Sequence, residues 1–348
     1  MLGRDQPLAL FMEGALDVDA GKMGFGILRY SPNPIACVID SKFAGRDAAE
    51  ITKIPRSAPV VGSIQEAIAL GAEVFVLGIA VPGGLIPETW FTAIDEAVAK
   101  GLSIVNGLHD LLAPRYQDLK PGQWIWDIRV EPEGISTNLG RARHLGNRRV
   151  LMIGTDMSIG KMTAGLEIWK AARERGITAE FIATGQIGIT ITGSGVPLDA
   201  VRVDFASGAI EREMLRCESA DLVIVEGQGA LIHPASTANL PLLRGSMPTH
   251  LVLCHRAGLK TLKRDPSVVI PPLREYIKLY EDLGEACGTF PRPKTVAIAL
   301  DTRDFSDQEA EEWISRTEQE VGLPVADPVR VGPVKLLDAI LAHDPASR

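Results

Sequence analysis

The sequence predicts an α/β protein in which helices cover parallel sheets. Short apolar runs of strand length alternate along the chain with segments whose apolar residues recur at helical spacing. The length of 348 residues suggests two domains, at about 100 to 200 residues for each. Near the middle, an apolar run ends in Gly154 and is followed by a polar turn, Gly160-Lys161 and a helical segment. That order is typical of a phosphate-binding loop.

The first domain is predicted to be Rossmann-like and to span residues 1–112. Asp40 follows the second of its predicted strands, where a carboxylate can face a ligand crevice at the strand ends. Helices are expected at 63–70 and 87–100, the latter with a proline in its first turn. Strands are expected at residues 8–12, 35–39, 74–79 and 102–105.

The second domain is predicted to resemble the P-loop NTPases and to span residues 148–348. The segment before it, 113–147, contains proline and glycine and breaks the alternation, so it is predicted to connect the domains, although its WIWDIRV stretch could form one strand. Ser306 and Glu309 have the spacing of a capping box. Helices are expected at residues 160–175, 271–286 and 307–321, and strands at 149–153, 179–183, 201–204, 222–226, 250–254 and 295–300.

Composition and charge indicate a globular protein of the cytoplasm. The net charge of −8, without any run of Lys or Arg, argues against a nucleic-acid partner. The four cysteines lie far apart with no CxxC spacing, which favours free thiols in a reducing compartment. The apolar stretch near the N-terminus is too short for a signal peptide or a membrane span, so no membrane partner is expected. We also expect a homo-oligomer.

The phosphate-binding loop departs from the usual P-loop motif in two ways. Five residues separate Gly154 from Gly160, and Met162 stands where a Ser or Thr hydroxyl usually reaches Mg²⁺. A thioether is a poor ligand for a hard cation, so no metal is expected. The anion cradle itself is intact, which suits a diphosphate bound without hydrolysis at least as well as ATP. The residues expected to bind the cofactor are Thr155, Ser158, Ile159, Gly160, Lys161, Met162 and Thr163.

Other polar side chains follow the predicted strands. Glu226 ends an apolar strand and precedes glycines, so it could be a metal ligand, a general base or an ion-pair partner of Lys161. His233 precedes a proline, and its role could be functional or only that of a solvated or capping residue. Gln186 lies in a glycine-rich turn that suits a ligand crevice or a surface loop. Arg256 could bind a carboxylate or pair with a surface acid.

Two resemblances follow from these motifs. GTDMSIGKMT together with VEGQG resembles the paired loops of dethiobiotin synthetase, a metal- and ATP-dependent enzyme of the phosphate-loop class. The whole chain is more similar to a bacterial family long labelled as of unknown function, through EGAL, VIDS, GIAVPGG, NGLHDLL, IGTDMSIGKMTAGL, ATGQIG and VEGQGAL. Characterised members of that family are D-glutamate N-acetyltransferases that use acetyl-CoA and work beside a racemase-like enzyme in D-amino-acid catabolism.

The resemblance implies an N-acetyltransferase with acetyl-CoA as co-substrate and D-glutamate as acceptor. Such a reaction needs a base for the substrate ammonium, and Glu226 is the first candidate, with Asp156 or His233 as alternatives. It also needs cationic or polar groups for the substrate, and the candidates are Gln186, Arg202 and Arg256. Two other classes stay open, namely an ATP- and Mg²⁺-dependent ligase or kinase and a nucleotide-binding regulator.

Overall fold

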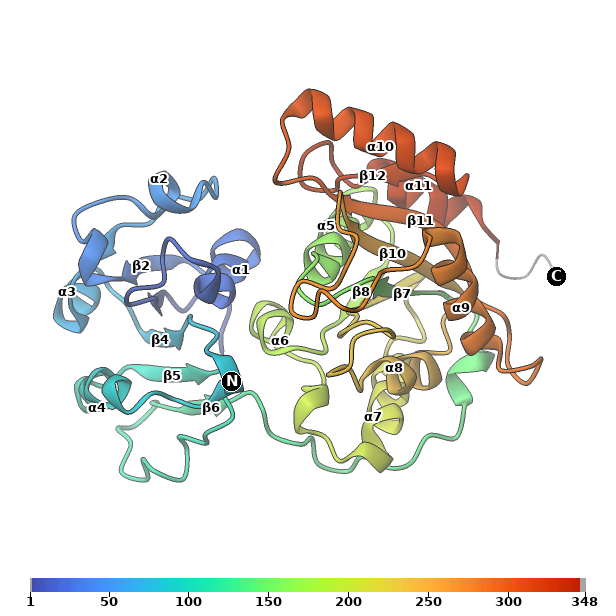
Figure 1. The fold of residues 1–348 in the computed structure, drawn as a ribbon. Coiled ribbons are helices and arrows are strands. Elements are labelled where there is room, and N and C mark those ends of the chain that lie inside the picture. Colours follow the sequence, from blue (N-terminus) through green and yellow to red (C-terminus); the bar gives the residue numbers. More distant parts are fainter. Residues whose placement is uncertain (1, 345–348) are drawn as a thin grey trace. The chain divides into compact units, whose positions relative to one another are not determined.

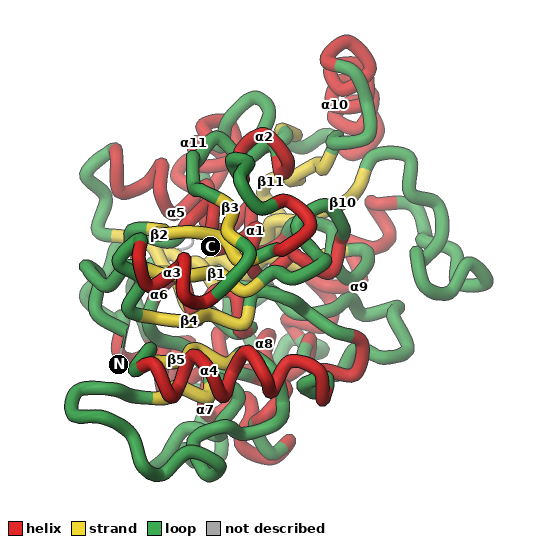
Figure 2. The backbone as a smooth tube through the Cα atoms, turned by 90° about the vertical axis from the view of Figure 1, so that its left-hand side faces the viewer, coloured by secondary structure: helices red, strands yellow, loops and turns green. Residues whose placement is uncertain are grey.

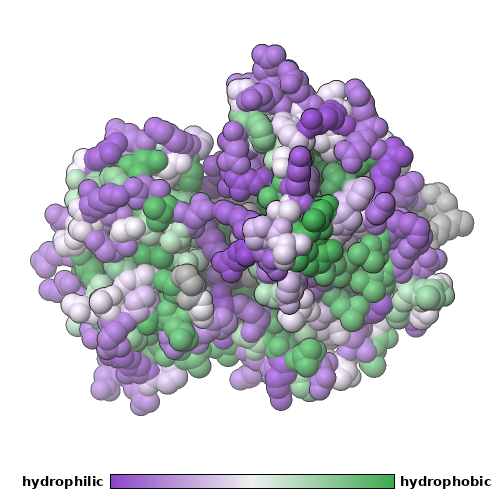
Figure 3. All heavy atoms as spheres, in the orientation of Figure 1, coloured by the Kyte–Doolittle hydropathy of each residue, from purple (hydrophilic) through white to green (hydrophobic). Residues whose placement is uncertain are grey.

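The computed structural model describes residues 2–344 and divides the chain into two compact units (Figure 1). One unit consists of Met1–Val130 and Gln186–Ala200, and the other of Glu131–Gly185 and Val201–Arg348. Within the described residues, no helix is both long and apolar enough to cross a membrane. Hydrophilic residues cover much of the face that Figure 3 shows.

The first unit contains a six-stranded parallel sheet in the order β3-β2-β1-β4-β5-β6. The four strands predicted here are confirmed, and β3 and β6 complete the sheet. The strand order reverses between β1 and β4, which is where ligands bind in open sheets of this kind. The strands are β1 (Leu8–Phe11), β2 (Ile35–Ile39), β3 (Val60–Val61), β4 (Val74–Leu77), β5 (Ser103–Asn106) and β6 (Ile125–Asp127).

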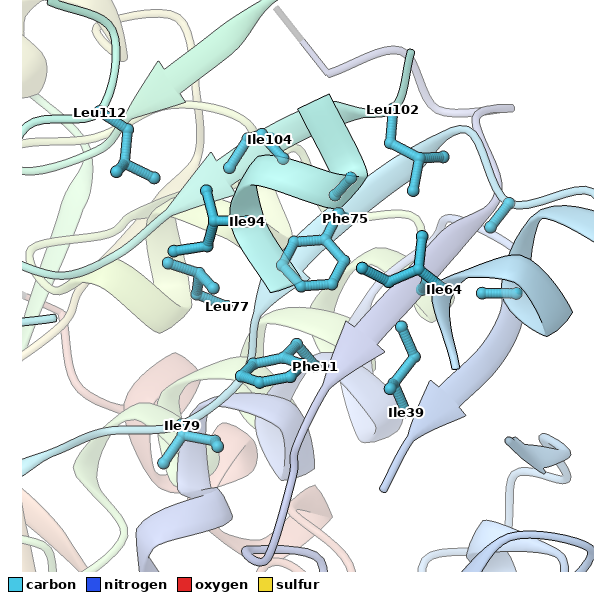
Figure 4. Packing of buried hydrophobic residues seen from close by; sticks show 14 of the residues in the cluster. Phe11, Ile39, Ile64, Phe75, Leu77, Ile79, Ile94, Leu102, Ile104 and Leu112 are labelled. Carbon is cyan, nitrogen blue, oxygen red and sulfur yellow. The ribbon is translucent and has the colours of Figure 1, made fainter. Parts of the chain in front are cut away.

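Helices pack against this sheet through apolar side chains. Figure 2 shows α3 and α4 alongside the strands, and Figure 4 shows the side chains that they bury against Phe11 and Phe75. The side chain of Ser63 accepts a hydrogen bond from the Glu66 N–H and so caps α3, the helix predicted at 63–70. Pro87 precedes a 3₁₀ turn and not α4 itself. The α-helices are α1 (Lys22–Tyr30), α2 (Ala48–Thr52), α3 (Ile64–Ala69), α4 (Phe91–Lys100) and α6 (Gln186–Thr192).

The boundaries of this unit differ from those predicted. The WIWDIRV stretch does form a strand, β6, but it joins the first sheet, so residues 113–130 are not a connection. Residues 186–200, predicted to lie in the second domain, pack with the first unit, where α6 contacts α1 and the Arg129 guanidinium contacts the Asp199 carboxylate. Both differences arise from pairings between residues far apart in sequence, which local patterns do not encode.

The second unit also contains a six-stranded parallel sheet, in the order β12-β11-β10-β7-β9-β8. Five of its strands agree with those predicted. The strand predicted at 201–204 is wrong, because α7 begins at Val203. The Val-Arg-Val-Asp alternation that indicated a strand lies at the start of an amphipathic helix. The strands are β7 (Arg148–Gly154), β8 (Ala179–Ile182), β9 (Leu222–Val225), β10 (His250–Arg256), β11 (Lys294–Asp301) and β12 (Val325–Ala326).

The helices of this unit confirm the three that the sequence predicts. The capping box before α10 is present, because the Ser306 side chain and Glu309 bond to each other's backbone N–H groups. Strand β7 lies between β10 and β9, so the loop that follows it is at the centre of the sheet's carboxyl edge. The helices are α5 (Lys161–Glu174), α7 (Val203–Arg216), α8 (Asn239–Ser246), α9 (Leu273–Glu285), α10 (Asp307–Val321) and α11 (Val334–Ala342).

Residues 131–147, predicted to be part of the connection, pack on α7. The buried Glu211 carboxylate accepts hydrogen bonds from the Leu139 N–H at 3.2 Å and the Arg141 guanidinium at 2.9 Å. Gly208, one helical turn earlier, allows the Ser136 backbone to come close to the helix. The segment is therefore an ordered part of the second unit.

Replacing Gly208 by Ala is expected to lower the free energy of unfolding by roughly 1–3 kcal/mol or more. A Cβ atom there would overlap the Ser136 carbonyl oxygen, and backbone atoms cannot move away as a flexible side chain can. Gly146→Ala is the matched control, because its Cβ meets nothing within 4 Å. Urea denaturation of both variants measures the difference, and equal midpoints would show that segment 131–147 is not held against α7.

Candidate active site

The phosphate-binding loop connects β7 to α5 and has the backbone geometry of an anion cradle. Gly160 has a φ of +92° and Ser158 a φ of +54°, so the chain turns sharply before the helix. The Ala164 N–H donates to the Gly160 carbonyl at 2.8 Å, which begins the helical bonding. The N–H groups just before Ala164 are therefore left for a ligand. A Cβ on Gly160 would meet nothing within 4 Å, so there is space at this point.

Lys161 is a buried cation within the loop. Its ammonium donates to the Asp156 backbone carbonyl at 2.7 Å, and no carboxylate of the described residues forms an ion pair with it. Burial lowers the pKa of Lys161 to about 8, against the opposing effects of Cys254, Asp156 and Glu226. Glycine at 154 leaves room for this side chain, because a Cβ there would lie 3.0 Å from the Lys161 Nζ. A buried ammonium of this kind favours an anionic ligand.

Glu226 is the first residue after β9, which is the strand next to the loop strand β7. Its Oε2 atom accepts hydrogen bonds from the Thr184 N–H at 2.8 Å and the Gly185 N–H at 3.1 Å. Burial raises the pKa of Glu226 to about 7, although these two bonds and the charge of Lys161 oppose the increase. A carboxyl group with that pKa can accept a proton near neutral pH. The geometry therefore suits a general base, and it includes no direct ion pair with Lys161.

Asp156 has its carboxylate engaged in holding the loop. One oxygen accepts from the Met157 N–H at 2.6 Å, and the other accepts from the Lys263 N–H at 2.8 Å. The side chain is buried. These contacts suit a structural role for Asp156, which attaches the loop to the segment around Lys263, and its role as an alternative base stays a prediction.

Two residues that the sequence did not single out, His255 and Tyr276, lie beside the loop. The Thr155 hydroxyl and the His255 Nδ1 atom are 2.8 Å apart, and both side chains are buried at the ends of neighbouring strands. Burial lowers the pKa of His255 to about 4, so its ring is neutral at pH 7. The Tyr276 hydroxyl donates to the Gly154 carbonyl at 2.9 Å. The position of His255 at a strand end was a usable signal, whereas Tyr276 on α9 gave none.

The other predicted site residues are placed as follows. His233 is buried in the turn after β9, where its Nδ1 atom accepts from the Ala235 N–H at 3.1 Å. Of the loop residues, Ile159 is buried, Ser158 is exposed, and both Met162 and Thr163 are half-buried at the start of α5.

The structure shows no contact between Glu226 and the side chains of the three residues predicted to bind the substrate, which are Gln186, Arg202 and Arg256. The Arg256 Nε atom donates to Asp304 at 2.8 Å, and the Arg202 Nε atom donates to Glu131 at 2.9 Å. Gln186 begins α6 of the first unit. For Arg256 the sequence left two alternatives, binding of a substrate carboxylate and pairing with a surface acid, and the structure shows the pairing, with Asp304. Substrate binding by these residues stays a prediction.

Fold and site together define a P-loop protein with an additional Rossmann-like domain. Its phosphate-binding loop has the usual lysine, Lys161, but has Met162 where a Ser or Thr hydroxyl usually follows. The model described as a domain of unknown function, DUF1611_C P-loop domain, matches residues 136–337. The corresponding DUF1611_N Rossmann-like model matches residues 41–131. The chain belongs to this DUF1611 family.

Relatives and a solved structure agree with this assignment. A Pseudoalteromonas protein named D-glutamate N-acetyltransferase is 38% identical over 81% of this chain and 84% of its own length. A Tritonibacter scottomollicae protein of the same name is 32% identical over 97% of this chain and 99% of its own. The crystal structure of a DUF1611 family protein from Anabaena variabilis is 46% identical, with a TM-score of 0.94, covering 97% of this chain and 100% of that one.

Proposed function

We propose that this chain is an N-acetyltransferase that moves the acetyl group of acetyl-CoA to the amino group of D-glutamate. The observation that carries the proposal is the pair of relatives with that name, one of which aligns over nearly the whole chain. We also propose that the protein acts in the cytoplasm, as a homo-oligomer and in D-amino-acid catabolism. Its four cysteines are all free, which suits a reducing compartment.

The loop supports acetyl-CoA as the co-substrate. Coenzyme A carries a diphosphate that is not hydrolysed during acetyl transfer, so the loop has to bind anionic oxygens and does not have to activate a metal. Lys161 and the N–H groups at the start of α5 would hold these oxygens, and the open space at Gly160 leaves room for them. Met162 occupies the position of the metal-binding hydroxyl, which fits a reaction without ATP hydrolysis.

Glu226 supports the acceptor chemistry. The carboxylate would take a proton from the substrate ammonium, and the neutral amine would attack the thioester carbonyl carbon. The carbonyl electron pair moves to oxygen as the N–C bond forms, and it returns when the C–S bond breaks. The CoA thiolate leaves and takes up the proton that the nitrogen still has to lose, which gives the free thiol. A base whose pKa is about 7 works at neutral pH, because it is ionised there and can still hold the proton that it takes.

The test is to incubate the protein with acetyl-CoA and D-glutamate and to follow the release of free thiol. We expect thiol release that depends on D-glutamate, with L-glutamate as the stereochemical control. A parallel incubation with ATP and Mg²⁺ examines the ligase or kinase alternative, which the position of Glu226 beside the loop favours. ADP formation without thiol release would overturn the proposal.

Acetyl transfer is expected to continue at the full rate in excess chelator. The reason is that Met162 offers a thioether where a metal-dependent P-loop offers a hydroxyl. Rates measured with chelator, with added Mg²⁺ and with neither should agree. Strict dependence on Mg²⁺ would make the ATP-dependent class the better assignment.

A further inference from the structure

His233 has a fixed ring orientation and a fixed tautomer. Its backbone N–H donates to the Ala230 carbonyl at 3.0 Å, and its carbonyl accepts from the Ser236 N–H at 2.9 Å, which closes the turn. The Nδ1 atom accepts from the Ala235 N–H. A nitrogen that accepts this bond carries no proton, so the ring proton is on Nε2. The Nε2 atom is therefore a hydrogen-bond donor.

That donor is buried and has no partner among the described residues. The His233 side chain is 7% exposed. The other buried polar atoms without a partner, on Asn147, Arg148 and Thr295, lie at or beside the amino ends of β7 and β11, away from the phosphate-binding loop. His233 is the one that follows the carboxyl end of a strand. A buried donor without an acceptor costs free energy in the unliganded chain, and a ligand oxygen would recover it.

The turn that carries His233 is attached to the phosphate-binding loop. The Leu231 N–H donates to the Tyr276 hydroxyl at 3.2 Å, and that hydroxyl in turn donates to the Gly154 carbonyl where the loop begins. The turn is therefore held at a fixed place relative to the first residue of the loop.

The hairpin at residues 261–269 is attached to the same loop. Its Lys263 N–H donates to the Asp156 carboxylate. The Thr261–Val269 bridge closes the hairpin, and hydrogen bonds from Ser267 lower the pKa of Asp265 at its tip. The turn that carries His233 and this hairpin are thus both bonded to the phosphate-binding loop.

We propose that the His233 Nε2–H group is the donor that stabilises the oxyanion formed on the thioester carbonyl during acetyl transfer. The inference rests on the proposed function. After Glu226 has taken the ammonium proton, the neutral amine nitrogen bonds to the carbonyl carbon and an electron pair moves onto the oxygen. The Nε2–H bonds to that oxygen and keeps its own proton. When the C–S bond breaks, the pair re-forms the carbonyl. The second proton that the nitrogen loses passes to the departing thiolate, which leaves as the free thiol.

The state of the donor in the free chain fits this role. A buried donor with no partner among the described residues makes its hydrogen bond only when a ligand oxygen arrives, and it bonds most strongly when that oxygen is negative. The hydrogen bond from the Ala235 N–H to Nδ1 suits His233 as a donor better than as a general base, and its role as an alternative base stays a prediction.

Two variants of His233 separate the donor from the turn. In His233→Asn, the side-chain oxygen can still accept from the Ala235 N–H, but nothing donates from the position of Nε2. In His233→Gln, the amide N–H group extends further and can replace the donor. We expect kcat to fall by about 10²–10³-fold in His233→Asn and to be partly restored in His233→Gln. The Michaelis constants should stay within a few fold, and the rise of kcat through pH 7 should persist. His144→Asn, an exposed histidine elsewhere in the unit, is the control without effect.

Each other outcome overturns the inference in a recognisable way. A normal kcat in His233→Asn shows that the donor is not used. A raised Michaelis constant for D-glutamate alone makes His233 a carboxylate ligand, and loss of the ionisation near pH 7 makes it the base. If the variants do not fold, ¹⁵N spectra of the wild-type imidazole decide, because a proton on Nδ1 contradicts the assignment. If the wild-type protein transfers no acetyl group, the proposed function itself is wrong. If the wild type is active but the His233 variants do not behave as expected, only the role of His233 is wrong.

Discussion

Lys161→Ala is expected to weaken the binding of acetyl-CoA by about tenfold to a hundredfold, which corresponds to about 1.5–3 kcal/mol for one hydrogen bond to a charged group. Lys161 is the single full positive charge of the loop, and no carboxylate of the described residues pairs with it. Its contribution is therefore available to the phosphates of a ligand. Titration calorimetry with coenzyme A measures the loss directly.

The pH dependence of binding gives an independent check on Lys161. Its pKa in the free chain is about 8, and phosphates bind the charged ammonium. Affinity should then be complete below pH 8 and decline as the pH rises above it, because binding must restore the proton. The Lys161→Ala variant should lack this decline.

Lys170→Ala is the matched control for Lys161→Ala. Lys170 is on the same helix, exposed and paired with Glu174 at 3.8 Å, so its loss should leave affinity unchanged. An unchanged Michaelis constant for acetyl-CoA in Lys161→Ala would mean that the loop holds something else. The variant is not expected to lose much stability, because removing a buried ammonium also removes its desolvation cost.

The loop and its strand could be predicted from the sequence because their signals are local. Gly154, Gly160 and Lys161 are separated by a few residues, and the helix that follows has its own apolar period. Glu226 was found in the same way, as a carboxylate at the end of an apolar run. These features depend on backbone geometry that neighbouring residues determine.

The features that the sequence did not reveal depend on distant partners. The pairing of β6 with β5 and the packing of α6 with the first unit join segments far apart along the chain. The pairing of Arg256 with Asp304 likewise became visible only when β10 and the end of β11 were placed side by side. A residue pattern predicts whether a segment forms a helix or a strand, but it does not predict which distant segment will pair or pack with it.

Glu226→Gln is expected to reduce turnover by about 10²–10⁴-fold while coenzyme A affinity stays within a few fold. The amide oxygen of Gln can still accept from the Thr184 and Gly185 N–H groups, so the turn that they form should remain. What is lost is the ability to take a proton from the substrate ammonium. Turnover and affinity are measured on the same preparations, with Glu180→Gln on the exposed face of β8 as the control.

The pH profile tests the proposed role of Glu226 as the base more specifically than the rate does. Burial raises its pKa from the usual 4.5 to about 7, so wild-type turnover should rise with pH through an ionisation near 7, and the Gln variant should lack it.

The pH dependence of stability is a second test of the raised pKa of Glu226. Because the folded pKa is the higher one, this carboxyl stabilises the fold most below about pH 4.5, and that contribution is lost as the pH rises through 7. Glu226→Gln should therefore flatten the fall in unfolding free energy over this interval. Near-normal turnover in the variant would mean that Glu226 only anchors the Thr184–Gly185 turn, and loss of coenzyme A binding would mean that it shapes the cradle.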